Sequence, residues 1–95
     1  MSQTVELPRV GEPGSGLDDN WRVIVLNDNH NTFEGVAFAL SSTLPGVSYD
    51  AGMAMANTLH SSGQAIVWAG AREPAEHYWE LLKDAGLTMA PLEQG

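Results

Sequence analysis

The chain has 95 residues, twelve of them acidic and four basic, and a formal net charge of -8 at pH 7. This charge repels phosphate backbones and anionic membrane surfaces, which disfavours nucleic-acid and membrane-surface roles. No apolar run approaches the roughly 20 residues of a membrane span, and no signal-peptide pattern is present. Because cysteine is absent, disulfides, zinc–cysteine sites and thiol nucleophiles are excluded. We expect a cytoplasmic, monomeric protein with one folded domain.

The N-terminal segment differs in composition from the rest of the chain. Residues 1–20 hold three glycines and two prolines and show no sustained periodicity. Such a segment buries too little apolar surface to offset the entropy of ordering. We therefore predict a flexible tail over residues 1–20 and a folded domain over residues 21–95. This domain opens with WRVIVL, residues 21–26, whose apolar and β-branched content predicts a strand buried on much of both faces.

Two helices are predicted after this strand. Apolar residues recur at helical spacing over residues 33–44, and Thr32 is a suitable N-cap. The second helix begins at residue 48 or 49 and ends near residue 62. Ser48 is its expected N-cap, and Gly63 its expected left-handed C-terminal cap. The predicted core face of this second helix consists of Ala51, Met55 and Leu59.

The remaining elements complete a small mixed fold. QAIVWAG, residues 64–70, predicts a second strand, and a third helix starts near Arg72 with Pro74 tolerated in its first turn. Residues 87–93 alternate as an edge strand does. The order β-α-α-β-α-β predicts an α/β fold of the α+β sandwich type, with three helices on one face of a mainly antiparallel three-stranded sheet.

A polar run, residues 27–31 (NDNHN), separates the first strand from the first helix. Asn and Asp commonly satisfy turns by bonding nearby backbone groups, but five such residues exceed the needs of one turn. Structural and functional interpretations therefore compete equally here. His60 follows near the end of the second helix, where the simplest interpretation is a surface histidine that interacts with the helix end.

These two features suggest one site if the strand end, the start of the first helix and the end of the second helix converge. Amide and carboxylate oxygens and an imidazole would then surround a point bordered by apolar side chains. Such a site suits an ammonium group beside a hydrophobic side chain. An N-terminal amino acid combines these two groups.

Metal and catalytic patterns are weak. An EF-hand loop counted from Asp28 has Phe33 in place of the required glycine and Ala39 in place of the required glutamate. The three histidines do not show zinc-ligand spacing. Neither an activated serine motif nor a glycine-rich phosphate loop is present. We expect no metal, no cofactor and no enzymatic activity.

Three segments carry a resemblance to a known family: VIVLNDN at 23–29, LHSSGQAIV at 59–67 and EPAE at 73–76. Over about residues 21–93 the chain resembles the ClpS adaptors, which recognise N-terminal degradation signals. The resemblance implies a non-catalytic adaptor that captures proteins beginning with Leu, Phe, Tyr or Trp. It also implies delivery of these proteins to the N-terminal domain of a ClpA- or ClpC-type AAA+ unfoldase, for degradation by ClpP.

The resemblance also implies roles for individual residues. The α-amino group would be bound by Asn27 and His60 directly, and by Asp28 and Asn29 directly or through water. The side-chain pocket would be lined by Val25, Leu26, Asn31, Phe33, Val36, Ala56 and Leu59. The surface that contacts the unfoldase would include Glu73 and Glu76.

The chain departs from the family pattern at several of these positions. Asn29 stands where the family commonly has aspartate, Phe33 and Ala56 replace methionines, and Tyr78 replaces a frequent lysine. A second hypothesis keeps the fold but makes the domain a regulator or scaffold that binds an unfoldase without reading N-termini. The C-terminal domain of the ribosomal stalk protein has a similar fold, and fold alone does not fix function.

Overall fold

The structure is a computed structural model that describes residues 20–95; the tail predicted over residues 1–20 lies outside this range except for its last residue. The elements in chain order are β1 (Trp21–Leu26), α1 (Phe33–Thr43), α2 (Tyr49–Ser62), β2 (Gln64–Gly70), α3 (Arg72–Asp84), β3 (Thr88–Met89) and β4 (Glu93–Gln94). The predicted order of strands and helices is therefore confirmed.

The last strand differs in detail from the prediction. The segment expected to form one edge strand is divided into β3 and β4, which gives a sheet of four strands instead of three. Ala90 still donates its N–H to the carbonyl of Ile24 at 3.0 Å. The next residue, Pro91, has no N–H to donate, so regular pairing stops there.

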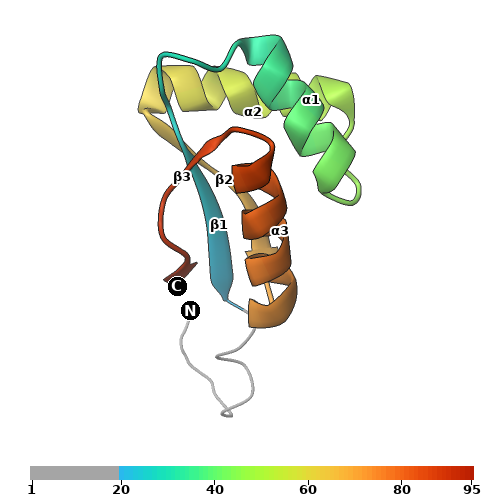
Figure 1. The fold of residues 1–95 in the computed structure, drawn as a ribbon, viewed down its shortest axis with the longest axis vertical. Helices are drawn as coiled ribbons and strands as arrows, with labels where there is room; N and C mark the ends of the chain where they lie inside the picture. Colours follow the sequence, from blue (N-terminus) through green and yellow to red (C-terminus); the bar gives the residue numbers. More distant parts are fainter. Residues whose placement is uncertain (1–19) are drawn as a thin grey trace.

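Strand β1 is the centre of the sheet (Figure 1). It pairs antiparallel with β2 on one side and with β3 and β4 on the other. Val23, Ile24 and Val25 are all buried, as predicted for a strand covered on both faces. The register between β1 and β2 shifts between Val23 and Ile24. Such a bulge increases the local twist of the strand pair.

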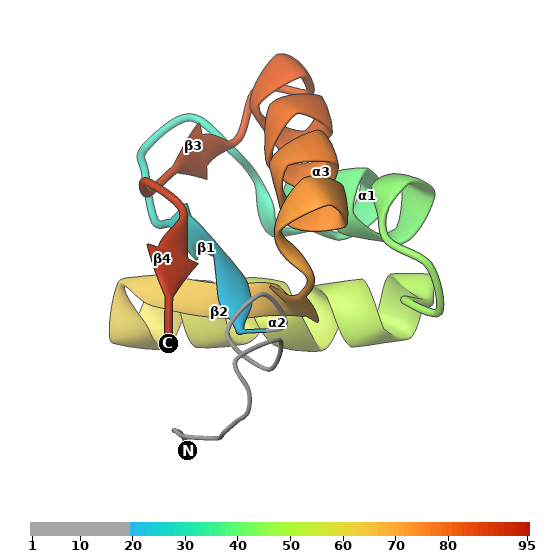
Figure 2. The ribbon, with the colours of Figure 1, turned by 90° about the horizontal axis from the view of Figure 1, so that it is seen from below.

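The helices cover two parts of the sheet. Helix α3 runs alongside β1 and β2, whereas α1 and α2 pack together across the end of the sheet where β1 ends and β2 begins (Figures 1 and 2). The largest fully buried side chains come from both helix layers and from the central strand; they are Leu40, Leu82, Val23 and Val25. Between Asn20 and Gly95, no helix combines the length and the apolar content that crossing a bilayer requires.

The predicted helix caps are observed. The Thr32 hydroxyl accepts a hydrogen bond from the N–H of Gly35 at 2.9 Å, and the Ser48 hydroxyl accepts one from the N–H of Ala51 at 3.0 Å. Gly63 ends α2 with a φ of 86°, the left-handed conformation that glycine adopts without steric cost. These caps fix where α1 begins and where α2 ends, and both points border the candidate site.

The core face of α2 includes Leu59, as predicted, but Gly52 and Ala56 are buried in place of Ala51 and Met55. Its buried residues are Gly52, Ala56 and Leu59, whereas Met55 is only partly buried. A Cβ on Gly52 would lie 2.7 Å from the carbonyl oxygen of Ala37 on α1. The absence of a side chain at Gly52 therefore permits close approach of the two helices, and this approach turns the small residues of α2 inward.

Candidate functional site

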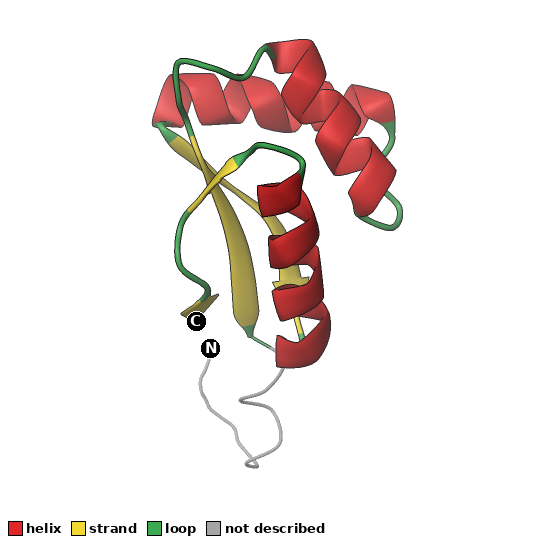
Figure 3. Ribbon diagram, viewed as in Figure 1, coloured by secondary structure: helices red, strands yellow, loops and turns green. Residues whose placement is uncertain are grey.

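The loop between β1 and α1 (Figure 3, green) begins beside the end of α2. The N–H of Asn27 donates to the carbonyl of Gly63 at 2.9 Å, which ties the end of β1 to the C-terminal cap of α2. The ring of Phe33, the first residue of α1, lies 5.3 Å from the His60 ring, with an interplanar angle of 56°. The strand end, the start of α1 and the end of α2 therefore converge.

Asp28 organises this loop through both carboxylate oxygens. Its Oδ1 accepts from the N–H groups of His30 at 2.9 Å and Asn31 at 2.8 Å. Its Oδ2 accepts from the Asn31 side-chain amide at 2.8 Å and from the Thr88 hydroxyl at 2.6 Å. These four bonds occupy the acceptor positions that an ionised carboxylate offers.

The same donors stabilise the ionised form of Asp28. The Thr88 hydroxyl has the largest effect, followed by the backbone N–H of Asn31, and together with the remaining donors they hold the pKa of Asp28 well below its ordinary value. Partial burial acts in the opposite direction but is outweighed. Asp28 therefore carries a full negative charge in the folded protein at neutral pH.

A second connection joins the loop to the turn after α3. The side-chain amide of Asn31 donates to the carbonyl of Gly86 at 3.0 Å. Gly86 has a φ of 99°, and Thr88 begins β3 two residues later. Gly86 and Thr88 could not be predicted as site residues from the sequence, because their partners in the loop lie 55 and 60 positions away in the chain. Nothing local in the sequence marks these contacts.

A small hollow lies between the loop, the end of β1 and the neighbouring helices α1 and α2. Its walls are formed by Val25, Leu26, Asn27, Asp28, Asn31, Val36, Leu59 and Leu87. Five residues predicted to line a side-chain pocket are among them: Val25, Leu26, Asn31, Val36 and Leu59. Phe33 and Ala56 are not; Ala56 is buried on the inner face of α2. Leu87 is a lining residue that the sequence analysis missed. The cavity volume is about 10 Å³, comparable with one water molecule.

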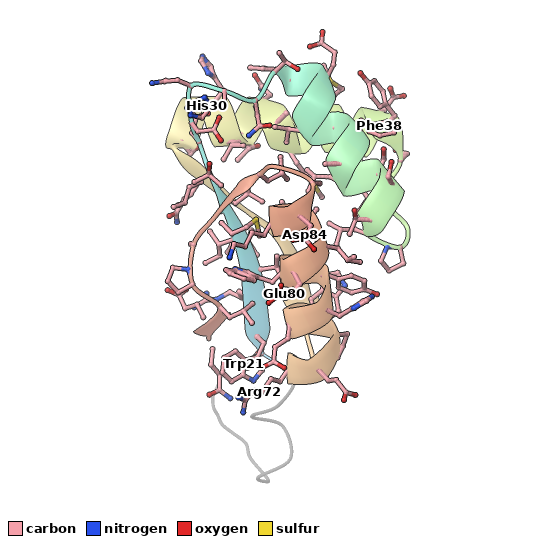
Figure 4. All side chains as sticks on the ribbon, in the orientation of Figure 1. Trp21, His30, Phe38, Arg72, Glu80 and Asp84 are labelled. Carbon is pink, nitrogen blue, oxygen red and sulfur yellow. The ribbon has the colours of Figure 1, made fainter. Side chains whose placement is uncertain are left out.

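The polar residues near the hollow differ in exposure. Asn27, Asn29 and His60 are exposed, whereas Asp28 is partly buried. His30 is also exposed and sits on the outer side of the loop (Figure 4). Within residues 20–95, no group of three or more histidine and acidic side chains is placed to hold a metal ion. The site thus offers hydrogen-bonding groups and one carboxylate charge beside apolar walls.

The two glutamates predicted to contact a partner lie on α3, away from the loop. Glu73 and Glu76 border an open groove of about 600 Å³. Glu76 forms an exposed ion pair with Arg72 at 3.1 Å. Arg72 in turn lies 5.2 Å from the centre of the Trp21 ring. Figure 4 places Arg72 and His30 at opposite ends of the long axis of the molecule.

Comparisons with known proteins agree on one family. Residues 17–93 match the family model described as ATP-dependent Clp protease adaptor protein ClpS. A ClpS adapter protein from Nostoc sp. is 54% identical over 74 residues, which cover 78% of this chain and 76% of the relative. The corresponding protein from Thermosynechococcus vestitus is 53% identical over 74 residues, which cover 78% and 79% of the two chains.

A solved structure supports the same assignment. Agrobacterium tumefaciens ClpS2 bound to L-phenylalaninamide superposes with a TM-score of 0.72 at 27% sequence identity. The superposition covers 82% of this chain and 99% of the other. The match in sequence extends over most of the described fold, including the loop and α3. The chain therefore belongs to the ClpS family of ATP-dependent Clp protease adaptor proteins.

Proposed function

We propose that this adaptor binds proteins whose N-terminal residue is Leu, Phe, Tyr or Trp and delivers them to a ClpA- or ClpC-type AAA+ unfoldase for proteolysis by ClpP. The observation that supports this proposal is that Asn27, which lines a hollow with apolar walls, donates its N–H to Gly63 at the end of α2, the helix that carries His60. The ligand of Agrobacterium ClpS2, L-phenylalaninamide, has the matching chemistry, because it joins a free α-amino group to a hydrophobic side chain.

In this proposal the α-ammonium group is held by neutral acceptors and attracted by a nearby charge. The side-chain carbonyl of Asn27 and an imidazole nitrogen of His60 accept its hydrogen bonds, with Asn29 as a further exposed acceptor. Asp28 contributes mainly its charge, because its carboxylate already accepts four hydrogen bonds within the chain. A charge at this position attracts a cation without needing direct contact.

The first side chain of the bound protein would enter the hollow. Leu87 and five of the residues expected for the pocket already line it: Val25, Leu26, Asn31, Val36 and Leu59. Phe33 and Ala56 would join these walls only when the hollow widens. A cavity of about 10 Å³ is too small for a leucine or phenylalanine side chain, so the walls must move apart on binding. Burial of such a side chain contributes about 1.5–3 kcal/mol in favour of this opening.

Delivery requires a second surface that stays free when the first is occupied. We assign contact with the N-terminal domain of the unfoldase to the exposed face of α3 that carries Glu73 and Glu76. This face and the outer side of the loop lie toward opposite ends of the molecule (Figure 4). A bound N-terminus and a bound unfoldase would therefore not compete for space.

The proposal is tested by titrating the protein with peptides that begin with Phe, Leu, Trp, Tyr, Ile or Val, together with an N-acetylated Phe peptide. We expect binding of the free Phe, Leu, Trp and Tyr peptides and loss of binding after acetylation, because acetylation removes the positive charge. Equal affinity for acetylated and free peptides, or no binding to any free peptide, would show that the proposed amino-group site is wrong.

Replacing His60 by Ala tests one half of this site. We expect the peptide affinity to fall by about 1–3 kcal/mol, the usual cost of leaving a hydrogen-bonding group unsatisfied. His77→Ala is the matched control, since His77 is an exposed histidine on α3. An unchanged affinity in His60→Ala, or an equal loss in both variants, would remove His60 from the site.

The small volume of the hollow favours one alternative. A regulator or scaffold that binds an unfoldase N-domain without reading N-termini would need no open pocket. This alternative predicts that the protein co-purifies with an unfoldase N-domain and binds none of the peptides in the titration. Saturable binding of a free Phe peptide excludes it.

A further inference from the structure

Leu87 forms one wall of the hollow and is held by contacts on both sides. It is 5% exposed, and its N–H donates to the carbonyl of Leu82 at 3.2 Å. The preceding residue, Gly86, accepts a hydrogen bond from the Asn31 side chain. The following residue, Thr88, donates its hydroxyl to Asp28. Three consecutive residues are therefore anchored around the wall.

Both anchors end in the loop that carries Asn27. The Asn31 amide donates to Asp28 as well as to Gly86, and the Thr88 hydroxyl donates to the same carboxylate oxygen. Thr88 pairs with Leu26 in the β1–β3 register. Because this pairing holds its backbone, the Thr88 hydroxyl is not required for the strand itself. Its bond to Asp28 therefore has another consequence, which is to join the wall to the loop.

Resting on the proposed function, we infer that Thr88 and Asn31 are positioning residues that fix Leu87 as a wall of the side-chain pocket and couple this wall to the amino-binding loop. Thr88 does not line the hollow and acts only through its contact with Asp28, whereas Asn31 also lies at the rim of the pocket. They determine how far Leu87 can retreat when a side chain enters. They therefore influence which first residues are accepted, and not only how stable the loop is.

The experiment replaces Thr88 by Val, which keeps the β-branched shape and removes only the hydroxyl. Dissociation constants for Phe-, Leu- and Val-initiated peptides are measured at a temperature where circular dichroism shows each variant to be folded. For Thr88→Val we expect about tenfold weaker binding of the Phe peptide. We also expect the Phe-to-Val affinity ratio to fall by about threefold, because a loosened wall discriminates less between side-chain shapes.

Two further variants isolate the hydroxyl. Thr88→Ser keeps the donor and should restore wild-type affinity and selectivity. Thr58→Val is the matched control: its hydroxyl donates only to the carbonyl of Ala54 within α2, so peptide binding should not change. If Thr88→Val does not fold, Thr88→Ala, which also removes the hydroxyl, is measured in the same way with the same expectation.

The outcomes separate this inference from the proposed function. If the wild-type protein binds the peptides and Thr88→Val binds them with the same affinity and selectivity, the inference is overturned and the proposed function stays intact. An equal loss in Thr88→Val and Thr88→Ser also overturns it, because the hydroxyl would then not be the cause. If the wild-type protein binds no free N-terminus, the proposed function fails, and the inference fails with it.

Discussion

The loop at residues 27–31 and the exposed face of α3 use carboxylate side chains in opposite ways. In the loop, Asp28 accepts four hydrogen bonds from its own chain. On α3, Glu73 and Glu80 border an open groove and have no ion pair with any residue of 20–95. A carboxylate surrounded by donors shapes the backbone, whereas a carboxylate facing solvent remains available to a partner. The hydrogen-bond donors around each carboxylate distinguish these two roles.

The two regions should also differ in their contribution to stability. The bonds of Asp28 restrain the loop and β3, and its partner Asn31 also donates to Gly86 in the α3–β3 turn. The Arg72–Glu76 pair joins two neighbouring turns of a single exposed helix. Pairs of this kind contribute about 0.3–0.5 kcal/mol. Mutations around the loop should therefore lower the free energy of unfolding strongly, and mutations on the outer face of α3 only weakly.

The largest effect is expected from Gly52→Ala, which should disturb the loop region and leave the α3 face intact. The new Cβ would lie 2.7 Å from the Ala37 carbonyl oxygen, so α1 and α2 must move apart. We expect the free energy of unfolding to fall by about 1–3 kcal/mol in a urea titration. Peptide affinity should fall too, because α1 carries Phe33 and α2 carries His60. Asn57→Ala, an exposed change on α2, is the control, and an equal effect in both variants would argue against the packing explanation.

An intermediate effect on the free energy of unfolding is expected from removing the Asp28 charge, and this effect should depend on pH. The folded-state pKa of Asp28 lies below its unfolded value, so its contribution to stability is present above a pH of about 4 and is lost as the pH falls further. At pH 7 we expect Asp28→Asn to lower the free energy of unfolding by about 1–2 kcal/mol. The difference from wild type should shrink in urea titrations below about pH 4. A constant difference between pH 7 and pH 3 would contradict this, and Asp84→Asn on the exposed end of α3 provides the control.

The smallest effect on stability is expected from Glu76→Gln. Loss of the Arg72–Glu76 pair should change the free energy of unfolding by less than about 0.5 kcal/mol. Peptide binding should stay at the wild-type level, whereas affinity for an unfoldase N-domain should decrease. Isothermal titration calorimetry, performed once with the peptide and once with the unfoldase N-domain, measures the two affinities separately. Weaker peptide binding in Glu76→Gln would mean that the two regions are not independent.

Much of the fold could be predicted from local sequence. The buried strand β1 followed from its consecutive apolar residues, and the positions of α1 and α2 followed from helical periodicity and from the caps at Thr32, Ser48 and Gly63. On the inward face of α2, Leu59 was predicted correctly, but Ala51 and Met55 were predicted where Gly52 and Ala56 are buried. That face is set by the close approach of Gly52 to α1, which depends on tertiary packing and not on periodicity.

The candidate site could be predicted only in part for a similar reason. The polar run and His60 drew attention because they stand out within their own segments. The internal partners of Asp28 and Asn31 did not, since Thr88 and Gly86 are unremarkable residues near the end of the chain. Leu87 was expected only as part of an alternating strand. Its place in the wall of the hollow depends on how β3 returns beside β1.

The hydrogen bond from Asn27 to Gly63 makes the geometry of the site depend on the register of the β1–β2 pairing. Leu26 pairs with Gln64 as the final rung of the β1–β2 ladder. The Asn27–Gly63 bond follows as the next rung. The site is therefore assembled by the same pairing that aligns the two strands. A molecule whose strands pair one residue out of step would separate Asn27 from the α2 cap and from His60. If the proposed function holds, capture of an N-terminal peptide would therefore report that the sheet has formed in its correct register.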